Sequence, residues 1–291
     1  MEFRVLGPLE VSEGGRPVAL GAPKQRALLA VLLLHANEVV SRERLIDELW
    51  GEAPPAHAAK LVQQYVSGLR KVLPAAVLLT RAPGYLLRVE PGRLDLSEFE
   101  RLLEDARTAR AERRNERAAD LYGHALSLWR GPALDDVALE SFGAREADRL
   151  NDLRLAALVE RIDLELELGP HAAVTAELEL LVARHPYQER LRGQLMLALY
   201  RSGRQTEALA VYTETRRQLR DELGLEPSQE LQRLERAILQ QDPALEAPRA
   251  PGPVVTADEA LPPPRLKTVT VVIAVLASSP SEPEALRKTI S

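Results

Sequence analysis

The sequence predicts a mainly α-helical protein with a small antiparallel β part, in which a winged helix-turn-helix is followed by a tetratricopeptide-like helical domain. Three observations support this fold class. Residues 1–93 contain short alternating apolar segments, then three helical patterns, then a hairpin signature. Residues 94–242 are almost wholly helical in pattern. Within them, Gly169 and Gly203 each end a predicted helix and lie 34 residues apart, which is the tetratricopeptide period.

Composition narrows the class of protein further. The chain has 291 residues, 45% hydrophobic and 28% charged, which suits two modest domains with buried cores. The absence of cysteine excludes disulfides, thiolate nucleophiles and thiolate metal sites. The amino terminus lacks a signal-peptide pattern, and the purest apolar run, residues 27–34, is too short to span a bilayer. We therefore expect a cytoplasmic protein with no membrane partner.

The first elements follow from local signals in order along the chain. The first twenty residues alternate around glycine and proline turns and predict short antiparallel strands. Pro23 begins a helical pattern that extends to His35. Ser41 is a favourable N-cap for a second helix over residues 42–50.

A third helix and a hairpin complete the first domain. Residues 58–73 form the helix, since their apolar positions step by four, three and four. Residues 77–80 and 85–89 form the hairpin strands, and Gly84 is expected to supply a positive φ in the turn between them. This order of elements is that of a winged helix-turn-helix.

The outer faces of the third helix carry groups that suit DNA. Glutamine presents a donor and an acceptor together and can address adenine, whereas lysine, arginine and serine reach guanine or phosphate. The alternative is a merely solvated polar face, but two glutamines, flanking cations and the hairpin converge on DNA binding. The predicted DNA-binding set is Lys60, Gln63, Gln64, Ser67, Arg70, Lys71, Thr80, Arg81 and Lys24.

Charge is distributed unevenly along the chain. The formal net charge is −5, which alone argues against nucleic acid. However, residues 1–93 carry 12 basic and 9 acidic side chains, whereas residues 94–242 carry 21 and 29. Such a division is expected when one part of a protein meets phosphate and the other meets protein.

Residues 60–73, with the Leu-Arg-Lys sequence at 69–71, and residues 79–87, with Pro-Gly-Tyr at 83–85, resemble the OmpR-type winged helix. The opening residues 3–11 and residues 23–29 narrow the resemblance to the Streptomyces antibiotic regulatory protein family. The resemblance covers residues 1–93. It implies a transcriptional activator that binds direct repeats near promoters and recruits RNA polymerase, with a role in secondary-metabolite (antibiotic) biosynthesis.

Residues 94–242 resemble the bacterial transcriptional activator domain. The similarity lies in four segments, at residues 95–99, 128–131, 191–204 and 222–228. It implies self-association and contacts with other proteins, whereas the residues alone predict stacked helix pairs without a visible ligand. Residues 97–100 have the sequence of a capping box and are expected to open the first helix.

The side chains in this region give no sign of metal or cofactor chemistry. The histidines lack the spacing of a helical metal site, and we expect them at the surface or at helix caps. Trp50 and Trp129 are expected to anchor cores. No catalytic residue, metal or cofactor is predicted.

The tail divides into two expected segments. Residues 243–266 are rich in proline and should form an extended linker. Residues 267–291 contain a strong strand pattern and are expected to begin a truncated or degenerate further domain. They are similar to the opening of class III nucleotidyl cyclase domains, but Val275 stands where that family has a metal-binding aspartate.

The sequence fits three classes of function to different degrees. The leading hypothesis is an activator that binds double-stranded DNA as a homodimer on tandem half-sites, with Trp50 and Glu52 in a loop that contacts the sigma subunit of RNA polymerase holoenzyme. The second is a tetratricopeptide-type adaptor without specific DNA readout. An enzyme fits poorly, since no phosphate-binding loop or catalytic constellation is present.

Overall fold

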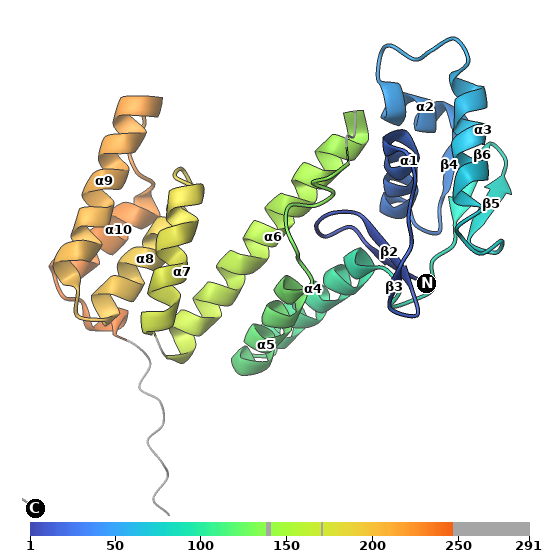
Figure 1. Cartoon of the computed structure of the whole chain (residues 1–291). Coiled ribbons are helices and arrows are strands. Elements are labelled where there is room, and N and C mark those ends of the chain that lie inside the picture. The colour runs from blue at the N-terminus through green and yellow to red at the C-terminus, as the bar shows by residue number, and fades with distance from the viewer. Residues whose placement is uncertain (138–140, 170, 247–291) are drawn as a thin grey trace, which may run out of the picture. The chain divides into compact units, whose positions relative to one another are not determined.

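The computed structural model describes residues 1–137, 141–169 and 171–246, with the side chains of residues 141–142 and 171–173 left out (Figure 1). Most of these residues are helical, and two small antiparallel sheets lie in the N-terminal part. The predicted fold class is thus confirmed. The strand pattern predicted within residues 267–291 lies outside the described residues. No described helix is long and apolar enough to cross a membrane.

The first sheet is formed by β1 (Glu2–Arg4), β2 (Glu10–Glu13) and β3 (Arg16–Pro17). Its strands are antiparallel in sequence order, as expected, with Phe3 opposite Val11. Both of these side chains are buried in the core. The alternation of apolar and polar residues therefore sets which face of the sheet packs inward.

The winged helix contains α1 (Pro23–Leu34), α2 (Arg42–Trp50) and α3 (Ala58–Leu69). Its sheet, in the order β4-β6-β5, consists of β4 (Val39–Ser41), β5 (Leu78–Arg81) and β6 (Gly84–Leu87). The predicted N-cap is confirmed, because Ser41 Oγ accepts a hydrogen bond of 3.1 Å from Arg44 N. Strand β4 was not predicted, because it is too short to show a pattern of its own.

Helix α3 is shorter than the predicted span of residues 58–73. After Leu69 the backbone tightens into turns, in which Lys71 N donates to Gly68 O and Val72 N to Leu69 O. Pro74 prevents the helix from continuing, because it has no backbone N–H and its ring would clash with the carbonyl of Arg70 in a helix. Leu73 still reaches the core, with 4% of its surface exposed.

The role predicted for Gly84 is wrong. Its φ does not lie in the left-handed region. Instead, a Cβ at this position would lie 1.8 Å from Val40 O of the neighbouring strand β4. The glycine is needed for close approach of two backbones, a contact that local sequence does not reveal.

The helical part begins with α4 (Asp95–Ala111), α5 (Asn115–Ser127) and the long α6 (Ser141–Leu168). It continues with α7 (His171–Arg184), α8 (Glu189–Arg201), α9 (Gln205–Leu223) and α10 (Gln229–Leu239). Neighbours along the chain pack on one another, as Figure 1 shows for α4 with α5 and for α7 with α8. Gly169 and Gly203 follow α6 and α8 with positive φ, as helix-ending glycines do.

The start of α4 differs from the predicted capping box. Ser97 lies inside the helix, which begins at Asp95 and has no side-chain cap. The carboxylate of Asp95 instead accepts hydrogen bonds from Val5 N and Leu6 N in the N-terminal part. A long-range contact therefore replaces the local one.

Two hydrophobic cores occupy the described residues. The first joins the N-terminal elements to α4, α5 and the first part of α6, and extends from Phe3 to Leu164. The second extends from Val159 to Ile238. Trp129 packs edge-on against Phe99 in the first core, which confirms its predicted role as an anchor.

The segment after α10 is not extended at its start. A short 3₁₀ helix spans Pro243–Leu245, where an extended linker was predicted. Leu245 packs against the second core, and its carbonyl accepts a hydrogen bond of 2.8 Å from Arg201 Nε. These contacts outweigh the preference of the proline-rich sequence for an extended backbone.

Candidate nucleic-acid interface

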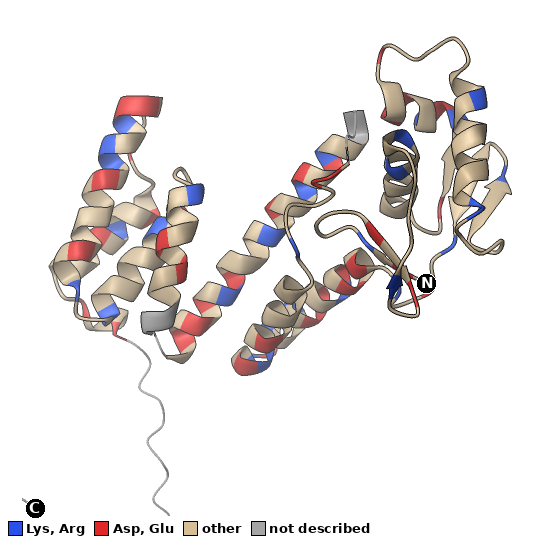
Figure 2. Cartoon of the chain, viewed as in Figure 1, with Lys and Arg blue, Asp and Glu red and all other residues tan. Residues whose placement is uncertain are grey.

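Helix α3 has one buried face and one exposed face. Val62, Val66 and Leu69 are almost fully buried in the first core. The opposite side chains are exposed, namely Lys60, Gln63, Gln64 and Ser67, and exposed Lys71 follows in the next turn. Figure 2 marks basic residues at both ends of the helix. The spacing of three to four residues places these groups on one continuous stripe.

The groups on this stripe are free to bind a ligand. Among the described residues, none of the side chains of Lys60, Gln63, Gln64, Ser67 and Lys71 has a hydrogen bond or ion pair with another protein group. A stripe of unused donors and acceptors on an exposed helix is the arrangement that reads base edges in a major groove.

Arg70 and Thr80, also predicted to bind DNA, bind each other. Arg70 Nη2 donates to Thr80 Oγ1 at 2.8 Å, and Arg70 Nε donates to Leu78 O at 3.1 Å. These bonds tie the end of α3 to strand β5 of the hairpin. Arg81, at the end of that strand, is exposed and has no partner among the described residues.

Lys24 contacts α2 and not the α3 stripe. The side chain is half-buried, and its ammonium donates a hydrogen bond to Leu49 O at the end of α2. It also lies 5.9 Å from the centroid of the Trp50 ring, within cation–π range. The structure therefore gives Lys24 a role in joining α1 to α2.

The Trp50 ring contacts the side chains of Lys24 and Tyr65. Its ring stacks on Tyr65 of α3, with centroids 6.3 Å apart and an interplanar angle of 25°. Trp50 is partly buried against the first core, which confirms its predicted role as an anchor. Glu52, in the loop that follows, is exposed.

Two residues that position α3 are not indicated by helical periodicity. Tyr65 completes the stack with Trp50, and Gln25 of α1 fills the space beside Gly68. A Cβ on Gly68 would lie 2.8 Å from Gln25 Oε1. The available signal was a glycine inside a helix, which is unfavourable unless another group approaches closely.

The N-terminal part and the helical part are joined by polar contacts. Arg26 of α1 forms an ion pair with Asp136, whose other oxygen accepts from Leu9 N at 2.7 Å. Buried Glu48 of α2 accepts a hydrogen bond of 2.7 Å from Gly143 N of α6. The winged helix is therefore anchored on the helical part by faces other than the α3 stripe.

Comparison with family models gives two matches. The model described as "Transcriptional regulatory protein, C terminal" matches residues 15–87. The model described as "Bacterial transcriptional activator domain" matches residues 94–239. The first match contains the α3 stripe and the hairpin, and the second contains the helices from α4 to α10.

Several known proteins are similar over 83% of the chain. It is 46% identical over 243 residues to regulatory protein AfsR of Streptomyces coelicolor, but spans only 24% of that protein. It is 40% identical to regulatory protein DnrI of Streptomyces peucetius and spans 93% of it. Its structure is similar to that of Mycobacterium tuberculosis EmbR in complex with a low affinity phosphopeptide, with a TM-score of 0.79, 39% identity and coverage of 65% of that chain.

Proposed function

The chain belongs to the Streptomyces antibiotic regulatory protein family of DNA-binding transcriptional regulators, and we propose that it activates transcription by binding direct repeats at promoters and recruiting RNA polymerase. One observation supports the DNA-binding part most strongly. The exposed stripe of α3 carries glutamine, lysine and serine side chains that form no hydrogen bond or ion pair with the described residues. We further propose that the protein acts in the cytoplasm, where promoters lie, and that it is not an enzyme.

We assign different roles to different parts of the stripe. Gln63 and Gln64 lie near its middle, where a recognition helix approaches the base edges most closely, and either can pair with adenine in the major groove. Lys60 and Lys71 flank them and are expected to contact phosphates. Arg81 extends from the hairpin toward the neighbouring backbone, while Arg70 and Thr80 fix the position of that hairpin.

Affinity is proposed to come from two protomers on tandem half-sites. The winged-helix part has only a small excess of positive charge, 12 basic against 9 acidic side chains, so a single copy is expected to bind weakly. Two copies about 10–11 base pairs apart would occupy the same face of the duplex. Self-association through the helical part would then raise the effective concentration of the second copy.

Polymerase recruitment is assigned to the loop predicted over residues 50–55, whose first residue, Trp50, is the last residue of α2 in the structure. Glu52 in this loop is exposed and lies outside the α3 stripe, so it is available for the sigma subunit while α3 is on DNA. The genes controlled are proposed to serve antibiotic biosynthesis, by analogy with the family. A Glu52→Lys variant should bind promoter DNA normally and fail to stimulate transcription in a purified system. Normal stimulation would contradict this assignment.

The DNA-binding proposal is tested by fluorescence anisotropy on a duplex with two direct repeats and on a random duplex. Gln64→Ala should change the preferred base at one position, since it removes a base contact. Lys71→Ala should weaken both duplexes alike and reduce the slope of log affinity against log salt by about 0.9. Arg117→Ala on α5 is the matched control, because this exposed arginine lies outside the stripe.

Two outcomes would overturn the proposal. If Gln64→Ala and Lys71→Ala both weaken specific and random DNA equally, the division of roles is wrong. If the wild-type protein fails to bind either duplex at low ionic strength, DNA readout is absent, and the adaptor hypothesis takes its place.

A further inference from the structure

Helices α6 and α7 enclose a cleft that the proposed DNA-binding function does not use. It contains a cavity of about 540 Å³, whose wall includes Asn151, Arg154, Leu180, Arg184 and His185. A second cavity of about 860 Å³ adjoins it on the side of α5. The two share Arg154 among their lining residues and thus belong to one cleft.

The first cavity holds positive charge without a counterion. Arg154 donates to Gly131 O at 3.2 Å and lies 5.1 Å from the centroid of the Trp129 ring, but among the described residues it has no carboxylate partner. Arg184 is exposed and likewise has no hydrogen bond or ion pair within the described chain. Burial and the nearby charge of Arg184 lower the pKa of Arg154. The two guanidinium groups therefore repel each other in a concave site.

The acidic side chain that lines this cavity is already neutralised. Both oxygens of Glu177 accept hydrogen bonds of 2.6 Å from Arg161 Nη2. Arg161 also pairs with Glu165, so these three residues form a closed set. No negative charge in the lining of the cavity is left for Arg154 and Arg184.

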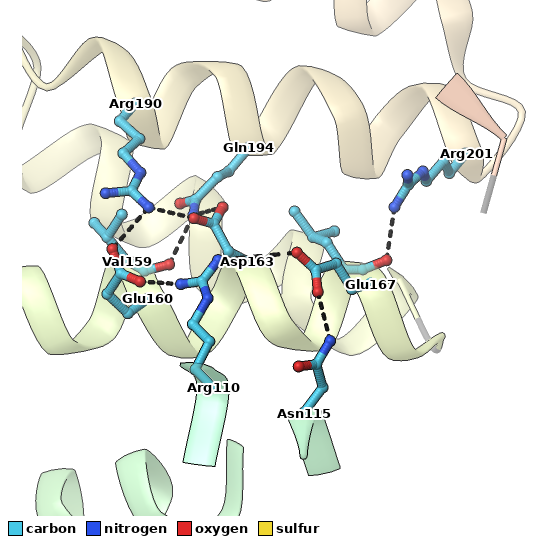
Figure 3. A network of polar contacts seen from close by, with 10 residues as sticks. Arg110, Asn115, Val159, Glu160, Asp163, Glu167, Arg190, Gln194 and Arg201 are labelled. Carbon is cyan, nitrogen blue, oxygen red and sulfur yellow. Dashed lines mark hydrogen bonds and ion pairs between the residues drawn. The ribbon is translucent and has the colours of Figure 1, made fainter. Parts of the chain in front are cut away.

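Another face of α6 shows the contrasting arrangement. There Glu160 pairs with Arg110 of α4 and Arg190 of α8, and Arg190 also reaches Asp163, as Figure 3 shows. Each of these arginines has a carboxylate partner. The arginines that contact this face of α6 thus have carboxylate partners, whereas Arg154 and Arg184 in the cleft have none among the described residues and remain available to an anion from outside.

Exposed leucines line the same cleft. Leu180, in the wall of the first cavity, has 64% of its surface exposed, and Leu168, in the wall of the second, has 41%. A free anion would leave both leucines uncovered. A nucleic-acid backbone offers phosphates to the two arginines but no apolar side chain to cover the leucines. A segment of protein with both carboxylates and apolar side chains fits these features best.

We propose that the cleft between α6 and α7 binds an acidic, leucine-rich segment of a partner protein. The carboxylates of this segment pair with Arg154 and Arg184, and its apolar side chains cover Leu168 and Leu180. Charge complementarity gives such a site its selectivity, and the buried apolar contact adds affinity. The inference does not depend on DNA binding.

The test measures fluorescence anisotropy of the full chain with a labelled peptide that alternates pairs of leucine and glutamate. Arg184→Glu reverses an exposed charge and should weaken peptide binding by about tenfold or more. Leu180→Ser should weaken it as well, and a peptide with glutamine in place of glutamate should bind poorly to the wild type. Arg233→Glu, an exposed position on α10, is the matched control and should have no effect. Melting temperatures and binding to promoter DNA are measured for every variant, with Arg184→Ala as a second substitution.

Four results would overturn the inference. The first is that the peptide binds Arg184→Glu and Arg184→Ala as tightly as the wild type. The second is that Arg233→Glu loses as much affinity as Arg184→Glu. The third is that the peptide does not bind the wild type even at low ionic strength. The fourth is that inorganic phosphate displaces the peptide fully while Leu180→Ser has no effect on peptide binding. This result would make the cleft a site for free anions. Arg184→Glu should bind promoter DNA as the wild type does. A loss of peptide binding with normal DNA binding therefore concerns the cleft and not the proposed DNA-binding function.

Discussion

The guanidinium of Arg70 and the hydroxyl of Thr80 are 2.8 Å apart and join the end of α3 to strand β5 of the hairpin. A second bond, from Arg70 Nε to Leu78 O, holds the guanidinium in one plane. One planar side chain thus connects the two elements that are proposed to contact DNA together.

We predict a measurable coupling between these two residues. A double-mutant cycle with Arg70→Ala and Thr80→Val should give a coupling of about 0.5–1 kcal/mol in the free energy of unfolding, because exposure to water keeps such a bond near the lower end of the range for protein hydrogen bonds. Urea denaturation of the four proteins measures it. Strictly additive effects would mean that the bond does not persist in solution.

The contact between Gly84 and strand β4 leads to a prediction about stability. Gly84→Ala should lower the free energy of unfolding by about 2 kcal/mol or more, because the new Cβ would overlap Val40 O at 1.8 Å and force β6 away from β4. Gly123→Ala in α5 is the matched control. No atom lies within 4 Å of a Cβ there, so alanine should stabilise the helix by about 0.5–1 kcal/mol. Equal effects of both substitutions, measured by urea denaturation, would contradict the explanation.

Features of the fold that depend on local sequence could be predicted. The hydrogen bond that caps α2 at Ser41 is one of them, and the apolar spacing of Val62, Val66 and Leu69 in α3 is another. Features that depend on distant backbone could not be predicted. The carboxylate of Asp95 caps the amides of Val5 and Leu6 rather than its own helix, and no local pattern indicates such a contact.

The same distinction applies to the candidate site. Sequence was sufficient to place Gln63, Gln64 and Lys71 on an exposed surface, because helical periodicity fixes which side of α3 is buried. It was insufficient for Lys24, whose ammonium is bound by Leu49 O, a partner 25 residues along the chain. Whether a polar side chain is free to bind DNA depends on such tertiary partners, and periodicity contains no information about them.

Glu48 gives a third prediction, about the joint between α2 and α6. Only 2% of this residue is exposed, and its carboxylate accepts the hydrogen bond of Gly143 N. Glu48→Ala should lower the free energy of unfolding by about 1–3 kcal/mol, because it leaves a buried amide without an acceptor. Glu48→Gln, which keeps an acceptor oxygen, should lower it less. Glu43→Ala, exposed on the same helix, is the control, and an equal loss in that variant would refute the role of the buried contact.

Asp95 makes stability depend on pH in the direction opposite to that of an ordinary paired carboxylate. Burial raises the pKa of this residue above its usual value of 3.8, although hydrogen bonds from Val5 N and Leu6 N and the charge of Arg130 act in the other direction. The folded protein therefore binds the proton of Asp95 more tightly than the unfolded chain does. The contribution of this group to stability is complete below about pH 4 and decreases as the pH rises through the raised value.

The fourth prediction follows from that sign and compares the wild type with Asp95→Asn. The variant cannot titrate at this position, and its neutral amide resembles the protonated carboxyl of the wild type, so the two proteins should have similar stability at about pH 4. Because only the wild type loses stability as Asp95 ionises, its free energy of unfolding should fall relative to that of the variant between pH 4 and pH 7. Urea denaturation of both proteins across this range measures the difference. Asp120→Asn, at an exposed position on α5, controls for the loss of a carboxylate. If the stability of the wild type relative to Asp95→Asn instead rises with pH, the hydrogen bonds from Val5 N and Leu6 N, rather than burial, dominate the titration of Asp95.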